Sequence, residues 1–143
     1  MFSGKFTSRP IRVNLGANGL NFQRADILVH GLDQSGESFE GRVFLNNPEA
    51  NVETPADPKH GYAGCFSVYG YGLWPEKPGD PPSAPDTIRA PIDKDLIATD
   101  AVRAAAAHGP EVTVTIVPVF PRNPVVDAHT ALKLEGVSIE IHP

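Results

Sequence analysis

The sequence has very little cysteine and no excess of basic residues. Cys65 is the only cysteine among 143 residues, so no disulfide can form within the chain. The 12 Lys and Arg residues are outnumbered by 17 Asp and Glu residues, and the formal net charge is -5. Because nucleic-acid binding needs a concentrated basic surface, this composition excludes nucleic acid as the main partner.

Long hydrophobic runs are also missing. No apolar stretch approaches the roughly 20 residues that span a bilayer. The opening MFSGKFTSRP lacks the long apolar region of a secretory signal. We therefore expect a reduced, cytoplasmic protein without a membrane partner. A hydrophobic fraction of 41% and a charged fraction of 20% are ordinary for a globular protein of one domain.

Glycine and proline are plentiful instead, with 13 and 15 residues, and they separate short apolar runs. Apolar and polar residues alternate with period two in PIRVNLG near the start and in GVSIEIH at the end. We predict an all-β fold, an antiparallel β-sandwich of about seven strands and one short helix. It forms a single domain over residues 1–143, with residues 1–23 as an N-terminal strand and lead-in.

The pairing of strands and the core are predicted from the same pattern. Residues 24–32 and 39–46 flank a polar turn, and we expect them to pair as an antiparallel hairpin. In YAGCFSVYG, Phe66 and Val68 share the face toward the core, while Cys65 and Tyr69 share the opposite face. One core is expected to contain Leu28, Val43, Phe66, Val114, Ile116 and Ile139.

One segment, TDAVRAAAAHGP, has the composition of a helix. Thr99 or Asp100 is predicted to cap its start, and the pair Gly109 and Pro110 is predicted to end it. Before it, DTIRAPI is predicted to be a short strand that Pro91 ends. The helix is short, so packing against the sheets must stabilise it.

Metal-binding and catalytic patterns are absent from the sequence. No two of the histidines have the spacing of metal ligands on a helix; they are His30, His60, His108, His129 and His142. Asp26, Asp33 and Glu37 could bind a cation or act as acid and base, but they lack a calcium-loop pattern, and we expect turn and solvating roles. We predict no metal, no cofactor, no catalytic residues and no enzymatic activity.

Several segments, in order along residues 24–142, resemble a known family. They are ILVHGLDQSGESFEGRVFLNN, YAGCFSVYG, LIATDAVRAA and the pair VTVTIVPV and LKLEGVSIEI. Together they resemble the C-terminal β-sandwich domain of the tyrosinase, polyphenol oxidase and molluscan hemocyanin type. Two positions depart from that pattern: residues 41–44 read Gly-Arg-Val-Phe in place of lysine-phenylalanine-aspartate-valine, and Cys65 stands where serine is usual.

The resemblance implies a free-standing sandwich without the dicopper domain. In those families the sandwich follows an α-helical domain whose histidines bind copper, and a side chain from the sandwich restricts access to the copper pocket. This chain has no such helix bundle, so we expect neither stoichiometric copper nor phenol oxidation from it. Cys65 could be a copper-handling thiolate or a thioether partner, but we predict a small, buried residue.

The segment HGYAGCFSVYGYGLWPEKPGDPPSAP predicts a working surface. Tyr69, Tyr71, Trp74 and Pro75 lie at or in a Gly/Pro-rich loop, residues 70–86, and tyrosine and tryptophan are common anchors of interfaces. In the competing interpretation, Trp74 packs on its own sandwich.

The functional hypothesis is a non-catalytic accessory or shielding subunit. It would associate with a separate oxidase-type chain, which could be a dicopper protein, through this loop; a homo-oligomer is compatible with the same sequence. The alternative is a small-molecule or carbohydrate-binding module. A third reading, an enzyme, would use His30 or His60 in a pocket formed with a second copy.

Overall fold

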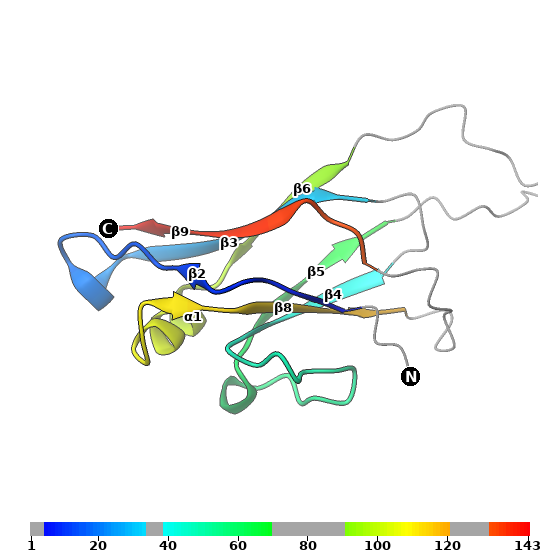
Figure 1. Cartoon of the computed structure of the whole chain (residues 1–143), viewed down its shortest axis with the longest axis horizontal. Coiled ribbons are helices and arrows are strands. Elements are labelled where there is room, and N and C mark those ends of the chain that lie inside the picture. Colours follow the sequence, from blue (N-terminus) through cyan, green and yellow to red (C-terminus); the bar gives the residue numbers. More distant parts are fainter. Residues whose placement is uncertain (1–4, 34–38, 70–90, 121–131) are drawn as a thin grey trace, which may run out of the picture.

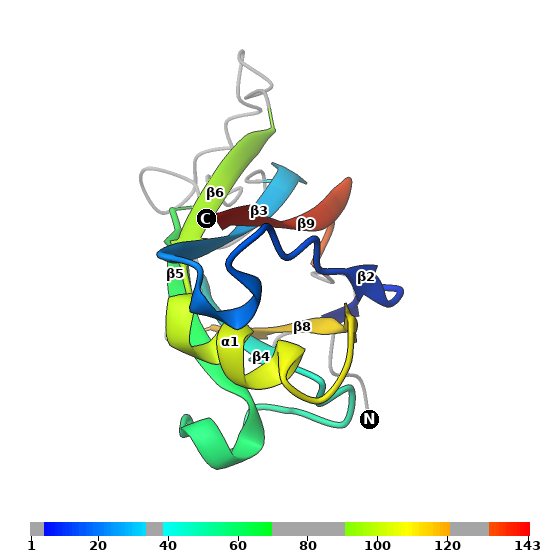
Figure 2. The same cartoon turned by 90° about the vertical axis from the view of Figure 1, so that its left-hand side faces the viewer.

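The strands form two facing sheets with the core between them (Figures 1 and 2). The computed structural model describes residues 5–33, 39–69, 91–120 and 132–143. Within these residues all long strand pairings are antiparallel and there is a single α-helix, which confirms the all-β fold class. The described part contains nine strands in place of about seven, because three of them are only two residues long.

The sheets differ in size. The lower sheet in Figure 1 has the strand order β1 (Phe6–Thr7), β8 (Val114–Val119), β4 (Phe39–Leu45) and β5 (Tyr62–Val68). The upper sheet has the order β6 (Ile92–Ile97), β3 (Arg24–Leu32) and β9 (Gly136–His142). A small ribbon pairs β2 (Ile11–Arg12) with β7 (Glu111–Val112). Two short 3-10 helices complete the described elements, η1 (Gly19–Asn21) and η2 (Pro58–His60).

The predicted hairpin of residues 24–32 with 39–46 is wrong. β3 pairs with β6 and β9 in the upper sheet, whereas β4 pairs with β5 and β8 in the lower sheet. Each strand is thus central in its own sheet and turns one apolar face toward the other sheet. A polar turn between two strands is compatible with a hairpin and with a crossing between layers, so the local pattern does not separate the two.

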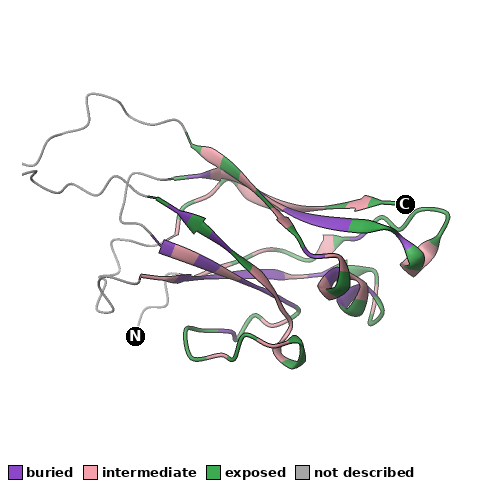
Figure 3. Cartoon of the chain, turned by 180° about the vertical axis from the view of Figure 1, so that it is seen from behind, coloured by how far each residue is buried: buried purple, intermediate pink, exposed green. Residues whose placement is uncertain are grey.

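Most of the buried side chains from both sheets form one core, and Figure 3 marks the buried positions along the strands. A second, small cluster contains Phe44, Ala50 and Val117. Five of the predicted core residues are confirmed in the main core: Val43, Phe66, Val114 and Ile116 are buried, and Ile139 packs against them. Leu28 was predicted wrongly. The residues of β3 that are fully buried in the core are Ala25, Ile27, Val29 and Leu32, and Leu28 lies on the other face, half-buried. In this run Ala25, Ile27 and Val29 alternate with Asp26, Leu28 and His30, so the period-two pattern favours Ile27 as the inward residue, and the choice of Leu28 did not follow it.

The helix α1 (Thr99–Ala106) lies across one end of the two sheets (Figure 2). It buries Val102, Ala105 and Ala106. The predicted side-chain caps are wrong: Ala98 precedes the helix, no side chain caps it, and Thr99 is its first residue. The Thr99 hydroxyl instead accepts a hydrogen bond from the backbone N–H of Ala25 in β3 (3.2 Å), which ties the helix start to the upper sheet.

Arg103 fastens the helix to the segment that leads into β3. Its guanidinium donates to the backbone carbonyls of Leu20 (2.8 Å) and Phe22 (2.7 Å). The guanidinium carbon also lies 4.8 Å from the centre of the Phe22 ring, a cation–π arrangement. Since an eight-residue helix is marginal alone, these contacts and the buried alanines hold it in place.

The strand β6 begins after Pro91, so the prediction that Pro91 ends a strand is wrong. Residues 86–90 of the predicted strand lie outside the described residues. Asp93, Lys94 and Asp95 obscured the strand in the sequence, because charged residues are uncommon in strand interiors. They fit here because β6 is an edge strand, where charges are usual.

Candidate functional site

The strand β5 brings one predicted site residue to the surface. Phe66 and Val68 are buried while Cys65 and Ser67 are exposed, so the predicted alternation is confirmed. Tyr69 follows the strand and is 78% exposed. The prediction that Cys65 is buried is wrong, because its side chain lies on the outer face of the lower sheet. The other predicted site residues, Tyr71, Trp74 and Pro75 with the loop 70–86, lie outside the described residues.

The surroundings of Cys65 are polar on one side and aromatic on the other. Arg42 lies opposite Cys65 on β4 and forms an ion pair with Glu40 (Nε to Oε1, 3.2 Å). Tyr62 packs against Phe44 with ring centres 5.5 Å apart. Burial raises the pKa of the Tyr62 phenol, and a hydrogen bond with Cys65 raises it further. The phenol therefore stays protonated at neutral pH and can donate a hydrogen bond.

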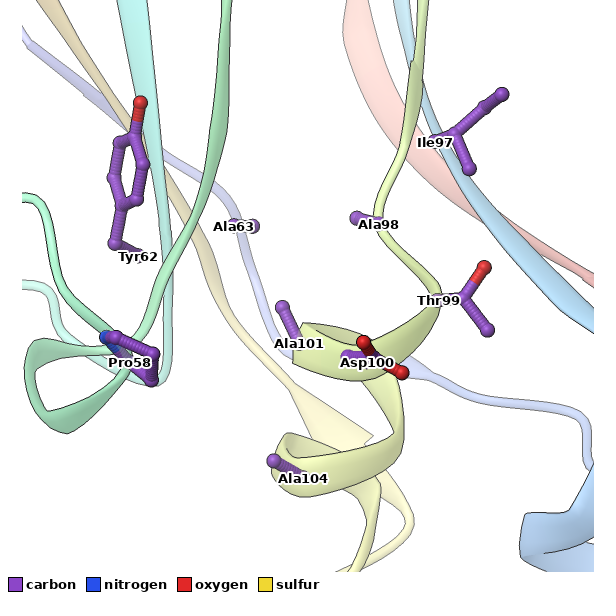
Figure 4. A pocket seen from close by; sticks show the side chains of 9 residues that line it. All are labelled: Pro58, Tyr62, Ala63, Ile97, Ala98, Thr99, Asp100, Ala101 and Ala104. Carbon is purple, nitrogen blue, oxygen red and sulfur yellow. The ribbon is translucent and has the colours of Figure 1, made fainter.

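A groove of about 500 Å³ lies beside the start of β5. Pro58, Tyr62 and Ala63 form one wall, and the opposite wall comes from the end of β6 and from α1 (Figure 4). The methyl groups on that wall belong to Ala98, Ala101 and Ala104. The walls are mostly apolar, and Thr99 and Asp100 line the groove as well.

Sequence reasoning missed this groove because its walls are about 35 positions apart along the chain. The only local signal is the spacing of Ala101 and Ala104, which places two small side chains on one side of the helix. That spacing is equally typical of a helix packed in a core. The groove therefore depends on how α1 is docked, and the sequence alone does not show it.

The histidines considered for catalysis are separately engaged. His30 Nε2 lies 2.8 Å from Ser138 Oγ across the upper sheet. His60 Nδ1 lies 2.6 Å from Asp57 Oδ1 in the loop before β5, and this contact lowers the pKa of Asp57. Within the four described segments, no three His, Cys, Asp or Glu side chains are grouped so that they could hold a metal ion. In the same segments, no helix is long and apolar enough to cross a membrane.

An ion-pair cluster lies on the outer face of the upper sheet. Asp26 is buried within β3 and accepts two hydrogen bonds from Arg24, 2.6 and 2.7 Å long. Asp95 of β6 lies beside it, and Glu140 of β9 is directly opposite Asp26. The expected turn or solvating role of Asp26 is therefore wrong, because the residue is in the middle of the sheet and paired.

Asp33 and Glu37 are the other two acids considered with Asp26. Asp33 is exposed just after β3, where its backbone N–H donates to the carbonyl of Lys133 (3.0 Å). Glu37 lies outside the described residues. The three carboxylates are thus not shown to form a common cation site, and the structure gives Asp26 an ion-pairing role of its own.

The pKa values of Asp26 and Asp95 move in opposite directions. Hydrogen bonds from Arg24 lower the pKa of Asp26, while the neighbouring Asp26 carboxylate raises the pKa of Asp95. On acidification Asp95 takes up its proton first. Its ionised form disfavours folding near neutral pH, and that penalty is relieved as the pH falls through its raised pKa. Ionised Asp26 stabilises the folded state. This stabilisation is fully present above the pKa of Asp26 in the unfolded chain, about 3.9, and is lost as the pH falls through the lower pKa of Asp26 in the folded protein.

We expect Asp95→Asn to raise stability at pH 7 by about 0.2–1 kcal/mol, because it removes a carboxylate beside Asp26 at an exposed site. The gain should shrink as the pH falls through the raised pKa of Asp95, because the wild-type carboxyl then becomes neutral as well. Urea unfolding of both proteins between pH 7 and pH 4 measures this. Asp93→Asn is the control on the same strand. A gain for Asp95→Asn that does not change with pH would contradict the carboxylate pair.

The fold belongs to a recognisable class, an antiparallel β-sandwich of the kind that forms part of polyphenol oxidases. The solved structure of recombinantly expressed latent aurone synthase (polyphenol oxidase) matches 99% of this chain with a TM-score of 0.59 and 19% sequence identity. The same enzyme from natural source matches 97% with a TM-score of 0.58 and 19% identity. The chain spans about a quarter of those solved chains, which is consistent with a C-terminal domain of that type.

The matches confirm the resemblance drawn from the strand motifs at the level of the fold. Because they cover 24% and 25% of the solved chains, they relate this protein to one part of a polyphenol oxidase and not to the whole enzyme. No protein-family model matches the chain, and no characterised protein matches it by sequence.

Proposed function

We propose that this chain is a non-catalytic accessory subunit that associates with a separate oxidase-type chain. The observation that carries the proposal is Tyr69, a large aromatic side chain that is 78% exposed where β5 leads into the Gly/Pro-rich loop 70–86. An exposed aromatic ring on a strand end offers a large contact area at a small cost in ordering. The fold supports the proposal, because it matches only a quarter of a polyphenol oxidase chain.

The mechanism is the burial of an aromatic segment in a partner. Tyr69, Tyr71 and Trp74 would enter a pocket of the oxidase, and Pro75 would stiffen the segment that carries them. The sandwich acts as a rigid support, since β5 is held by β4 and by the core residues Phe66 and Val68. In this role the chain shields the partner's pocket or restricts access to it.

We expect Trp74→Ala to weaken binding to the partner by about 2 kcal/mol or more, as is typical of an interface hot spot. The partner is first identified as the chain that co-purifies with the tagged protein from its source, and the proposal requires a helical, histidine-rich oxidase. Affinity is then measured by calorimetry with the purified pair. Tyr69→Ala is the matched variant, because its exposed side chain makes it neutral for folding.

Two results would contradict this function. Trp74→Ala could lower the unfolding midpoint of the isolated chain strongly, which would make Trp74 a part of its own sandwich. Alternatively, both aromatic variants could bind the partner as well as the wild type does, which would remove the segment from the interface.

The groove favours a second function, a small-molecule or carbohydrate-binding module. Its volume of about 500 Å³ is within the usual range for ligand pockets, and Tyr62 supplies an aromatic ring and a hydroxyl at its wall. NMR titration of the isolated chain with phenol and with glucose tests this function. Binding that Ala101→Trp removes and Ala107→Trp, outside the groove, leaves intact would support the module over the accessory subunit.

A further inference from the structure

The free edge of β5 exposes backbone hydrogen-bonding groups. In β4 the N–H of Leu45 donates toward β5, to Gly61 O at 2.8 Å, and the N–H of Asn46 donates the other way, to Thr113 O at 2.9 Å. Odd-numbered residues of β4 therefore bond to β5. Since Gly41 is paired with Phe66, the alternation of an antiparallel ladder turns the N–H and C=O groups of the neighbouring Cys65 and Ser67 away from β4.

In the part of the chain that the structure describes, β5 pairs with β4 only. The outward backbone groups of Cys65 and Ser67 thus lie along an open sheet edge, and both side chains are exposed beside it. Such a row of donors and acceptors is a template for another strand.

Charge distinguishes this edge from the other long edges. The edge strand β6 carries Asp93, Lys94 and Asp95, and the edge strand β9 carries Glu140. Charged residues on an edge oppose the addition of further strands. The seven residues of β5, YAGCFSV, include no charged residue and no proline. Of these three strands, β5 alone carries no charged residue, and the irregularity in its pairing with β4 lies between Tyr62 and Gly64, before Cys65 and Ser67.

We infer that β5 is a homotypic interface, at which a second copy of this chain adds its own β5 antiparallel and joins the two lower sheets. A two-fold axis at Phe66 places Cys65 of each copy opposite Ser67 of the other, so the outward backbone groups of both strands pair with one another. No like charges meet, because neither strand carries any. A second copy fits better than an arbitrary strand, since it brings the same outward residues in reversed order.

The interface is separate from the proposed aromatic contact. Antiparallel pairing places the two Tyr69 residues at opposite ends of the joint, so each copy can still present its own aromatic segment to an oxidase. The further inference therefore does not depend on the proposed function, and Trp74→Ala should leave the dimer intact.

Cross-linking at the single cysteine tests the strand register of the proposed dimer directly. Paired strands lie about 4.8 Å apart and rise about 3.4 Å per residue, so in this register the two Cys65 residues are separated by roughly 8–9 Å on the same face. That distance is too long for a disulfide and suits a short bismaleimide. Because Cys65 is the only cysteine, a cross-linked dimer can form only through this position.

The test uses the full chain in sedimentation-velocity experiments over a range of concentrations, together with bismaleimide cross-linking. We expect a concentration-dependent dimer that is cross-linked at Cys65. Ser67→Lys should raise the dimer dissociation constant at least tenfold with an unchanged unfolding midpoint. Val52→Lys, which adds the same charge at an exposed position outside β5, should leave the dimer intact.

A chain that stays monomeric at all concentrations would overturn the interface. So would a dimer that Ser67→Lys does not weaken, or one that the cross-linker fails to capture at Cys65. If Ser67→Lys fails to fold, the wild-type protein is cross-linked beside Cys65→Ser. A cross-linked dimer of the wild type alone supports the β5 interface, and its absence overturns it.

Discussion

Phe66→Ala is expected to lower the free energy of unfolding by about 3–5 kcal/mol, the usual cost of truncating a buried phenylalanine. The Phe66 side chain is only 8% exposed and meets the Phe39 ring edge-to-face, with ring centres 6.5 Å apart. Its ring also covers Gly41 on the neighbouring strand, where an added Cβ would lie 2.4 Å from the ring. Truncation therefore leaves a cavity in the lower sheet that Gly41 has no side chain to fill.

Urea unfolding followed by circular dichroism measures this effect as a lower midpoint with an unchanged m-value. Tyr69→Ala is the control, because it removes an aromatic ring three residues further along that is exposed. Its midpoint should stay close to that of the wild type. Equal midpoints for Phe66→Ala and wild type would mean that Phe66 is not a core residue.

Gly61→Ala is expected to cost more than about 2 kcal/mol, because a strained backbone and a clash act together. Gly61 ends η2 with a φ of 81°, in the left-handed region that alanine adopts poorly. A Cβ at this position would lie 2.2 Å from the backbone oxygen of Leu45, and backbone cannot move aside as a side chain can. The Gly61 carbonyl also accepts the N–H of Leu45 (2.8 Å), so any shift weakens the entry to β5.

Gly19→Ala separates the cost of the left-handed backbone from the cost of the clash. Gly19 has a φ of 56°, but an added Cβ would have no heavy atom within 4 Å. Its substitution should cost only the backbone penalty, about 1–2 kcal/mol. Thermal unfolding of the two variants gives the comparison. Equal losses for both would show that the contact with Leu45 adds nothing.

Local sequence patterns were enough to predict most of the elements and to tell which residues of β5 face the core. The alternation in YAGCFSVYG placed Phe66 and Val68 in the core and left Tyr69 exposed, as the structure shows. The alanine-rich segment 99–108 contains the helix, and the order of the strand motifs pointed to the polyphenol oxidase type of sandwich. These features depend on neighbours within a few positions, which is the range over which strand and helix periodicity acts.

The prediction took the wrong phase in β3, and charge masked the strand β6. Ile27 shares its phase with Ala25 and Val29, whereas Leu28 shares its phase with Asp26 and His30, and the structure turns Ile27 inward. β6 was missed because Asp93, Lys94 and Asp95 dominate its composition, although an edge strand tolerates them. Cys65 was expected to be buried because free cysteine usually is, but its place in the alternation exposed it.

The sequence by itself determined the all-β class, the inward and outward residues of β5, and the exposed position of Tyr69. Only the tertiary structure decided that β3 and β4 lie in different sheets, that Asp26 is buried against Arg24, and that η2 and α1 enclose a groove. The physical reason is the range of the interactions. A side chain's face follows from its immediate neighbours, whereas strand partners, ion pairs and cavity walls come from segments far apart in the chain, and the packing of the whole core selects among them.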